Sequence, residues 1–338
     1  MEKIRIGVLC PSEIAFRRFI PALKKTKEFC YEGVSCATHA EWNGGDDPSL
    51  VYAEFEKAKR FEDTYGGRLY EGYESMLCDE NVDAVYIPLP PALHFKWAKS
   101  ALEHGKHIFV EKPFTTNLAN TMELIELAKT KHLAVHENYM FVYHSQIFFL
   151  LEKLREKVIG NIRLIRLAFG FPFRGASDFR YDKALGGGAL LDCGGYTVKL
   201  SSVLLGDTAR VTSSKLNFCD EFDVDVFGTA TIVNSEGVTA QLSFGMDNDY
   251  KCDIEVWGSE GTLIANRVFT PPSDLSPVIK LHTKNGDKNF DLLPDDSFYN
   301  SIQRFYECVT NKNSAEDNMR EILFQAKLVN ELQIGDQL

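Results

Sequence analysis

A glutamate and a lysine stand where a short apolar segment of the chain ends. Residues 108–110 (Ile-Phe-Val) are typical of a buried β-strand, and Glu111, Lys112 and Pro113 follow directly. Proline has no N–H to give to a strand ladder, so the strand is expected to end here. Ligands bind at the carboxyl ends of the strands in an open parallel sheet, where Lys112 would face a cleft. An ordinary surface Glu–Lys pair is the alternative for this stretch alone.

The elements that must position this lysine alternate between strand and helix in the first half of the chain. The predicted strands are residues 4–9, 34–37, 84–87, 108–110 and 133–136, with helical patterns between them. Such alternation with short connections predicts a right-handed, doubly wound parallel sheet.

The pattern changes near residue 160. Strand patterns separated by turn residues cover 162–171, 211–218, 226–233, 238–244, 252–257, 262–264 and 278–282. Helical patterns occur only at 188–205 and in the closing segments 298–308 and 315–332. We therefore predict an α/β fold: a Rossmann domain at 1–145, and an α/β domain at 146–338 with a large, mainly antiparallel open sheet. The closing C-terminal helix could pack back onto the Rossmann domain.

Composition limits the classes of partner. The 338 residues hold 37 Lys and Arg against 48 Asp and Glu, a formal net charge of −11, which argues against a nucleic-acid partner. No apolar run is long enough to span a membrane, and residues 1–6 alternate like a strand rather than a signal peptide. The eight cysteines are scattered singly, so neither a metal site nor a disulfide framework is predicted. We expect a cytoplasmic protein with no membrane partner.

The turn after the first strand departs from the usual dinucleotide-binding pattern. In that pattern, G-x-G-x-x-G, glycines let the backbone approach a pyrophosphate at a helix N-terminus. Here the window is Gly7-Val-Leu-Cys10-Pro-Ser12, with cysteine in place of the central glycine. By motif alone this turn binds nothing. The small residues and the helix N-terminus that follows still permit a nucleotide.

The end of the second predicted strand bears on which nicotinamide cofactor is used. An acid there would bind the ribose hydroxyls of NAD. The sequence has Thr38 and His39 instead, with Glu41 two residues later. A hydroxyl and an imidazole suit a 2′-phosphate better, and the basic residues within 57–60 could add charge if that segment folds back. NADP(H) is therefore preferred and NAD(H) remains possible; alternatively, Thr38 merely finishes a strand.

Three motifs occur together in this chain. They are Pro88-Leu-Pro-Pro91 with His94, Glu111-Lys-Pro113, and Gly186-Gly-Gly-Ala-Leu-Leu-Asp192-Cys-Gly-Gly-Tyr196. With them the chain resembles the glucose–fructose oxidoreductase / inositol dehydrogenase (GFO/IDH/MocA) family over essentially its whole length. Within that family it looks most like the NDP-hexose 3-ketoreductases, and the supporting stretches are 137–141, 179–181, 255–259 and 267–272.

The resemblance implies a Rossmann domain followed by an α/β domain whose open sheet makes a homodimer or homotetramer. It also implies that Lys112 and Tyr196 flank the nicotinamide ring, with Asp192 nearby; we assign these three to catalysis and expect no metal. The cofactor would contact Gly7, Cys10, Pro11, Ser12, Glu13, Ile14, Thr38, His39, Pro88, Leu89, Pro90, His94, Glu111, Lys112 and Asn138. The substrate would contact Tyr139, His144, Arg174, Arg180 and Tyr181.

The chemistry of these residues suits carbonyl reduction. A reduced carbonyl becomes an alkoxide, which needs a proton donor within hydrogen-bond reach. A phenol such as that of Tyr196 has an unperturbed pKa of about 10, and a neighbouring ammonium such as that of Lys112 lowers it. Asp192, four residues before Tyr196, would share its helix face. Structural roles for Tyr196 and Asp192 are the alternative.

We therefore expect an NAD(P)H-dependent reductase of a ketone in a sugar or a nucleotide-linked sugar. Arginine binds phosphate oxygens bidentately, so Arg174 and Arg180 would suit a diphosphate, unless they are solvated loop charges. A dihydrodiol, aldose or cyclitol dehydrogenase is one alternative. A catalytically silent nucleotide- or sugar-binding protein is another.

Overall fold

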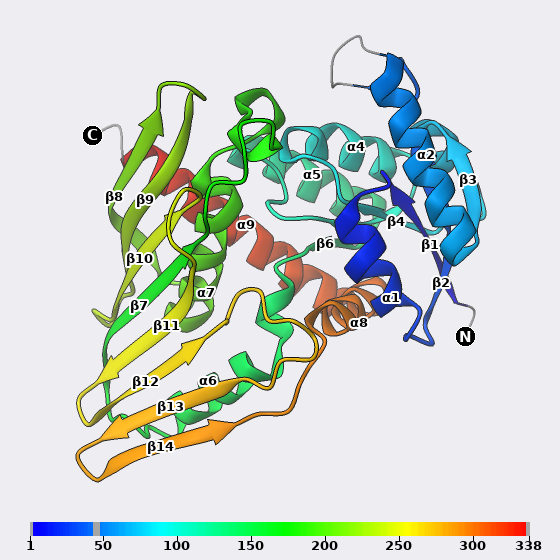
Figure 1. The fold of residues 1–338 in the computed structure, drawn as a ribbon. Coiled ribbons are helices and arrows are strands. Elements are labelled where there is room, and N and C mark those ends of the chain that lie inside the picture. The colour runs from blue at the N-terminus through cyan, green and yellow to red at the C-terminus, as the bar shows by residue number, and fades with distance from the viewer. Residues whose placement is uncertain (1–2, 43–47, 336–338) are drawn as a thin grey trace. The chain divides into compact units, whose positions relative to one another are not determined.

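The computed structural model describes residues 3–42 and 48–335 (Figure 1). The chain divides into two compact units. The first consists of Met1–Thr115, Ala119–Asn138 and Ser301–Leu323, and the second of Thr116–Leu118, Tyr139–Asn300 and Phe324–Leu338. Among the described residues, none of the helices is both long and apolar enough to cross a membrane.

The first unit is built on a parallel sheet, as the sequence predicted, and this sheet has six strands. Its strands are β1 (Ile4–Leu9), β2 (Phe29–Cys36), β3 (Arg68–Glu71), β4 (Ala84–Ile87), β5 (His107–Val110) and β6 (Val135–Glu137). Their order is β3-β2-β1-β4-β5-β6, so the direction of winding reverses between β1 and β4. In doubly wound sheets, ligands bind at the carboxyl ends of the strands beside such a reversal.

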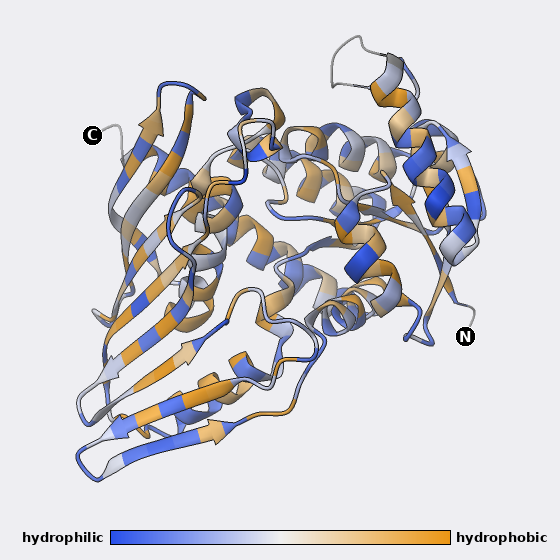
Figure 2. Cartoon of the chain, viewed as in Figure 1, coloured by the Kyte–Doolittle hydropathy of each residue, from blue (hydrophilic) through white to orange (hydrophobic). Residues whose placement is uncertain are grey.

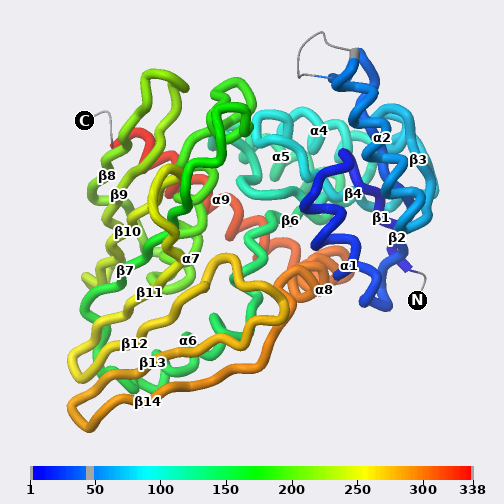
Figure 3. The backbone as a smooth tube through the Cα atoms, in the orientation of Figure 1, coloured from blue at the N-terminus to red at the C-terminus, as the bar shows by residue number. Residues whose placement is uncertain are grey.

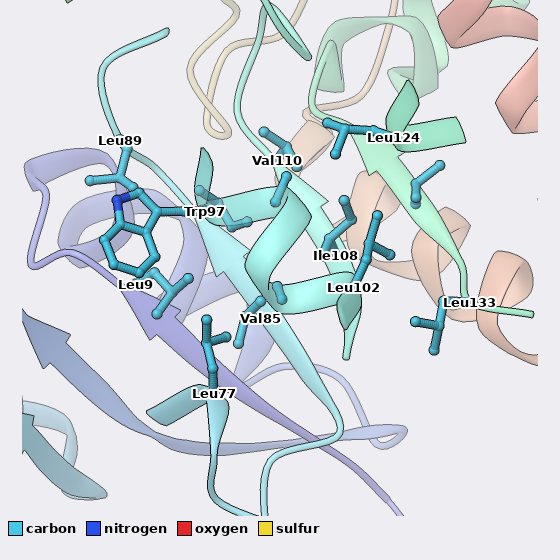
Figure 4. Close-up of a cluster of buried hydrophobic side chains, with 14 of the residues drawn as sticks. Leu9, Leu77, Val85, Leu89, Trp97, Leu102, Ile108, Val110, Leu124 and Leu133 are labelled. Carbon is cyan, nitrogen blue, oxygen red and sulfur yellow. The ribbon is translucent and has the colours of Figure 1, made fainter. Parts of the chain in front are cut away.

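Helices cover both faces of this sheet. They are the π-helical turn η1 (Ala15–Phe19) continued by α1 (Ile20–Leu23), then α2 (Pro48–Tyr65), α3 (Tyr73–Leu77), α4 (Pro91–Glu103), α5 (Leu118–Lys131), and parts of α8 (Ser297–Thr310) and α9 (Lys312–Gly335). On one face, Val85 and Ile108 of the strands join Trp97 of α4 and Leu124 of α5 in a buried cluster (Figure 4).

The opposite face of this sheet is aromatic. Tyr86 of β4 stacks on Phe19 with ring centroids 3.8 Å apart, and Phe109 of β5 meets Phe305 of α8 at 5.3 Å. Such aromatic pairs bury large areas and add about 0.5–1.5 kcal/mol beyond that burial. Strands β4 and β5, which end at the candidate site, are thus packed against side chains on both faces of the sheet.

The second unit is built on an eight-stranded, mainly antiparallel sheet. Its strands are β7 (Ile162–Gly170), β8 (Arg210–Cys219), β9 (Val224–Val233), β10 (Thr239–Gly245), β11 (Lys251–Gly258), β12 (Gly261–Asn266), β13 (Val278–Thr283) and β14 (Gly286–Asp291). The order is β14-β13-β12-β11-β7-β10-β9-β8, and β7 and β10 are the parallel pair. Burial alternates along β11 and β9, and the matching alternation of hydropathy is visible in Figure 2.

Helices α6 (Ser145–Arg155) and α7 (Gly195–Leu205) belong to this unit. Phe149 of α6 packs on Phe290 of β14 at 5.1 Å, and α7 lies against β7 and β10. The tube in Figure 3 shows the chain leaving β7 and reaching α7 through a long loop before it returns to the sheet at β8.

Several elements differ from the sequence-based expectation, and the short helix α3 is one that was not predicted. Strands β3 and β14 were not predicted, because each lies at a sheet edge and buries too few side chains to show an apolar alternation. The helix expected over 188–205 is interrupted, since it starts as a π-helical turn, η5 (Leu190–Gly194), before α7 begins.

Candidate active site

In the first unit, Lys112 follows the carboxyl end of β5, with its preceding glutamate held in a buried network. Glu111 Oε1 accepts hydrogen bonds from the Tyr86 hydroxyl and from Asn138 Nδ2, both at 2.6 Å. Asn138 Oδ1 in turn accepts from Ser301 Oγ at 2.9 Å. Burial raises the pKa of Glu111 against the effect of these donors and of Lys112. Glu111 and Asn138 thus fix the turn that presents Lys112.

His94 links the turns after β4 and β5. Its Nδ1 lies 2.7 Å from the Pro113 carbonyl oxygen and its Nε2 lies 2.7 Å from that of Leu89. Burial, aided by the charge of Lys112, lowers the pKa of His94 to about 4 although both carbonyls oppose this. At neutral pH the ring is therefore uncharged and donates to only one of the two carbonyls. Its role is to hold the Pro-rich turn, Pro88 to Pro90, against the Lys112 turn.

This burial predicts acid sensitivity. An unfolded imidazole takes up a proton below pH 6.5, whereas folded His94 does so only near pH 4. The unfolded state binds more protons in that window, so stability present above pH 6.5 is lost as the pH falls towards 4, by about 3 kcal/mol in total. We expect the thermal midpoint of His94→Gln to fall less over this window than that of the wild type. The exposed His39 supplies the control, His39→Gln, and equal slopes for the wild type and His94→Gln would contradict the assignment.

The turn after β1 keeps the geometry of a glycine loop without its glycine. Cys10 has φ +98°, a left-handed conformation that glycine normally supplies. Ser12 Oγ accepts from Ala15 N at 3.2 Å and so caps the first helix. Glu13 and Ile14 are exposed beside it, Pro11 is buried, and burial raises the pKa of the Cys10 thiol. The turn offers a helix N-terminus, which suits a phosphate.

After the end of β2, Thr38 is hydrogen-bonded to Glu41, the acid that follows it in the sequence. Glu41 Oε2 accepts from Thr38 N at 2.9 Å, from its hydroxyl at 3.0 Å and from Tyr73 N at 3.0 Å. Glu41 Oε1 accepts from Glu74 N at 3.0 Å. Glu41 therefore serves as an N-terminal cap of α3, and His39 is exposed next to it.

The basic residues of α2 do lie near the β1 turn. Arg60 stacks on Phe16 at 3.8 Å and pairs with Glu13 at 3.4 Å, and the charge of Lys57 acts on Cys10. Glu54 of the same helix accepts from Ala37 N at 3.2 Å, and burial raises its pKa. Sequence reasoning missed Glu54, since nothing local marks an acid within an amphipathic helix as buried.

In the second unit, Tyr196 lies in an aromatic surrounding. Its ring is 5.1 Å from Phe169 of β7, 5.2 Å from Tyr139 and 5.6 Å from Phe141. The residue is 7 % exposed. A glycine is needed just before it, because a Cβ on Gly195 would collide with the Tyr139 hydroxyl. The ring of the candidate proton donor is therefore held by packing.

Asp192 is paired with one of the two predicted substrate arginines. Arg180 Nε donates to Asp192 Oδ2 at 2.7 Å, and Arg180 Nη1 donates to Asp178 at 3.1 Å. Burial works against the charge, but the two carboxylates raise the pKa of Arg180 above its usual value, so the guanidinium stays charged. Arg180 is thus neither solvated nor free in this arrangement, and it fixes Asp192.

The glycine triplet allows the chain to start the helix that carries Asp192 and Tyr196. Gly188 has φ +119°, and a Cβ there would collide with Asp225 Oδ1. Asp225 Oδ2 accepts from Leu190 N at 2.7 Å and so caps η5. Asp225, on β9, is a second residue that sequence reasoning missed, because it lies 35 positions away from the helix it caps.

Gly188→Ala is expected to disturb this start. The strain at positive φ costs about 1–3 kcal/mol, and displacement of the helix could lower kcat by about 10²-fold. Gly175→Ala is the matched control, since Gly175 has φ +102° but open space around its Cβ position. Thermal melts and turnover should separate the two: both variants lose stability and only Gly188→Ala loses activity. Equal activity of the two would contradict this role.

The other predicted substrate residues have structural contacts. The Tyr181 hydroxyl donates to the Met246 carbonyl, and Arg174 lies over the Phe171 ring at 4.5 Å. His144 is fully buried and its Nδ1 accepts from Gln146 N at 3.1 Å, which caps α6. Burial lowers the pKa of His144 although Asp295 opposes this. Their contacts with a substrate stay predictions.

Comparison with known proteins bears on what these features do. A model described as an oxidoreductase family with an NAD-binding Rossmann fold matches residues 47–139, and the GFO/IDH/MocA C-terminal domain matches residues 150–264. A dTDP-3,4-didehydro-2,6-dideoxy-alpha-D-glucose 3-reductase from Actinomadura kijaniata is 36% identical over 98% of this chain and 95% of its own. The chain belongs to the GFO/IDH/MocA family.

Two further matches of this GFO/IDH/MocA protein extend over nearly all of its length. The enzyme of the same name from Streptomyces violaceoruber is 35% identical over 97% of this chain and 94% of its own. A crystal structure of a 3-ketoreductase from Actinomadura kijaniata with NADP and TDP-benzene has a TM-score of 0.91 and 35% identity, and covers 99% of this chain and 98% of that one. The family, the fold and the oxidoreductase class expected from the sequence are confirmed.

Proposed function

We propose that this protein is an NADPH-dependent ketoreductase that reduces the C3 carbonyl of a nucleotide-linked deoxyhexose. The observation that carries the proposal is the similarity to dTDP-sugar 3-reductases over almost the whole chain. Crystal structures of the Actinomadura kijaniata enzyme include variants with a lysine replaced by alanine and with a tyrosine replaced by phenylalanine. Lys112 and Tyr196 supply the same two types of side chain in this chain.

The β1 turn fits a dinucleotide. The helix N-terminus behind Ser12 suits the pyrophosphate, and Cys10 adopts the positive φ that glycine normally supplies in such a loop. Thr38 and His39, with Lys57 and Arg60 of α2 near the turn, support a 2′-phosphate and hence NADP(H). When bound, the reduced nicotinamide supplies the hydride.

The protein must supply the proton that the reduced carbonyl oxygen takes up. We assign its donation to the Tyr196 hydroxyl, which would protonate the alkoxide as hydride reaches the carbonyl carbon. The Lys112 ammonium would lower the pKa of this phenol and hydrogen-bond a sugar or ribose hydroxyl. Asp192, held by Arg180, would position a sugar hydroxyl or the tyrosine. Arg174 is the candidate for the diphosphate.

The assembly and location are part of the same proposal. Exposed apolar side chains of the second sheet, among them Phe218, Phe227 and Trp257, support a homodimer or homotetramer through this sheet. We expect Trp257→Asp to lower the oligomeric state in sedimentation experiments. From the net charge and the sequence, we further infer a cytoplasmic location and no nucleic-acid partner.

Fluorescence titration with NADPH and NADH tests the cofactor. Saturable binding of NADPH, tighter than that of NADH, is expected, and binding of neither at millimolar concentration would overturn the proposal. Oxidation of NADPH in the presence of a dTDP-linked 3-keto sugar, and not with free aldoses, then tests the substrate class.

A further inference from the structure

We propose that the first unit carries a zinc-binding site formed by Glu74, Cys78 and His104. Among the described residues, these three side chains form a group that could hold a metal ion. Their ligand atoms all lie within 4.8 Å of one another. The site does not depend on the proposed reductase function. The sequence predicted no metal, because Cys78 and His104 lie 26 residues apart and form no recognisable spacing.

The fold brings the three side chains together at the ends of two helices. Glu74 lies in the first turn of α3 and Cys78 is its C-terminal cap, so the two are four residues apart on one helix face. His104 is the C-terminal cap of α4, just before β5. Lys112 follows the opposite, carboxyl end of β5. The two helix ends that carry Cys78 and His104 therefore lie away from Lys112, and a metal there would cross-link α3 to α4.

The distances match those in a tetrahedral zinc site. Cys78 Sγ lies 3.6 Å from His104 Nε2, and His104 Nε2 lies 3.7 Å from Glu74 Oε2. With Zn–S of about 2.3 Å and Zn–N and Zn–O of about 2.0–2.1 Å, tetrahedral angles put these pairs about 3.5 and 3.3 Å apart. The third pair, Cys78 Sγ and a Glu74 carboxylate oxygen, lies within 4.8 Å. Metal binding would draw the three ligand atoms closer together, which exposed side chains accommodate by small rotations.

One residue orients two of the three ligands. His104 Nδ1 lies 2.9 Å from the Ser100 carbonyl oxygen, which only accepts, so Nδ1 carries the hydrogen and the Nε2 lone pair is directed to the cluster. The Ser100 hydroxyl donates to Glu74 Oε1 at 2.8 Å and leaves Oε2 near His104. Such partners of ligating histidines and carboxylates are usual in metal sites, where they fix tautomer and orientation.

The donor set selects the type of metal. A thiolate and an imidazole are poor ligands for Mg²⁺ or Ca²⁺, which prefer oxygen, whereas Zn²⁺ takes S, N and O together. Three protein ligands leave the fourth position to water, which the exposure of all three side chains allows. Cysteine binds Zn²⁺ as the thiolate, so the affinity of the site for the metal would weaken at low pH.

Cobalt(II) substitution in the full chain tests the site. Protein freed of metal by a chelator and kept reduced should bind one equivalent of Co²⁺, with a thiolate-to-cobalt charge-transfer band in the near ultraviolet and tetrahedral bands in the visible. Zn²⁺ should displace the cobalt and abolish both. No stoichiometric binding of either metal would overturn the proposal.

Variants assign the ligands. Cys78→Ser should lose the charge-transfer band and His104→Ala should lose most of the affinity, while the matched control Cys30→Ser, which removes an exposed thiol on β2, should keep both. Ser100→Ala removes only a hydroxyl and should weaken binding by about 10- to 100-fold, so the site stays testable if a ligand variant does not fold. A charge-transfer band that survives in Cys78→Ser would overturn the proposal.

Discussion

Replacing Tyr196 by phenylalanine is expected to lower kcat by about 10²–10⁴-fold, the usual contribution of a positioned proton donor. The substitution removes one oxygen and keeps the ring that packs on Phe169 and Phe141. The affinity for NADPH and the thermal midpoint should therefore remain those of the wild type. Stopped-flow measurement of single-turnover NADPH oxidation isolates the chemical step.

Tyr65→Phe is the matched control for this experiment. The Tyr65 hydroxyl donates to the Phe16 carbonyl in the first unit, so its loss removes a structural hydrogen bond and no proposed proton donor. If Tyr196→Phe keeps wild-type turnover, or if it loses NADPH affinity in proportion to kcat, Tyr196 is not the donor.

The second large effect is expected from Lys112→Ala. In the proposed mechanism the ammonium would hydrogen-bond substrate or cofactor and would lower the pKa of the Tyr196 phenol, so we expect kcat of this variant to fall by about 10²-fold or more. If Tyr196 is the donor, reduction needs its phenol protonated, and we expect the activity of the wild type to fall at alkaline pH. Without the ammonium that pKa rises, and the alkaline limb of the kcat profile should move to higher pH.

The charge can be tested apart from the shape of the side chain. Lys112→Arg keeps a cation and should hold the alkaline limb nearer that of the wild type, while its different geometry leaves kcat reduced. Lys99→Ala removes an exposed lysine paired with Glu123 and should change neither quantity. An unchanged pH profile in Lys112→Ala would show that Lys112 does not act on the proton donor.

The buried strands were predictable because their signal is local. Ala84-Val-Tyr-Ile87 is buried at every position, and the central strands of both sheets show similar runs or alternation. Edge strands such as Arg68–Glu71 gain their structure from pairing with one neighbour, which no local pattern encodes. The π-helical turn at Leu190–Gly194 also escaped prediction, because it depends on a cap from Asp225 far along the chain.

In the candidate site, too, local motifs could be recognised in the sequence and long-range contacts could not. Lys112, Asp192 and Tyr196 stand in short motifs that the sequence displays, and their assignment to catalysis remains a proposal. The contacts that hold these residues in place could not be predicted from the sequence. Glu111 is fixed by Tyr86 and Asn138, and Arg180, expected to face substrate, pairs with Asp192. Such contacts join residues distant in sequence, and only the fold brings them together.

The most direct test of the central claim is the fate of the hydride. The protein would be incubated with NADPH carrying deuterium at both C4 positions of the nicotinamide and with a dTDP-linked 3-keto deoxyhexose. Mass spectrometry and NMR should find one deuterium on C3 of the sugar, a new hydroxyl at that carbon, and one NADP⁺ per sugar reduced. Deuterium at another carbon, or no transfer although NADPH binds, would contradict the assignment of this protein as a nucleotide-sugar 3-ketoreductase.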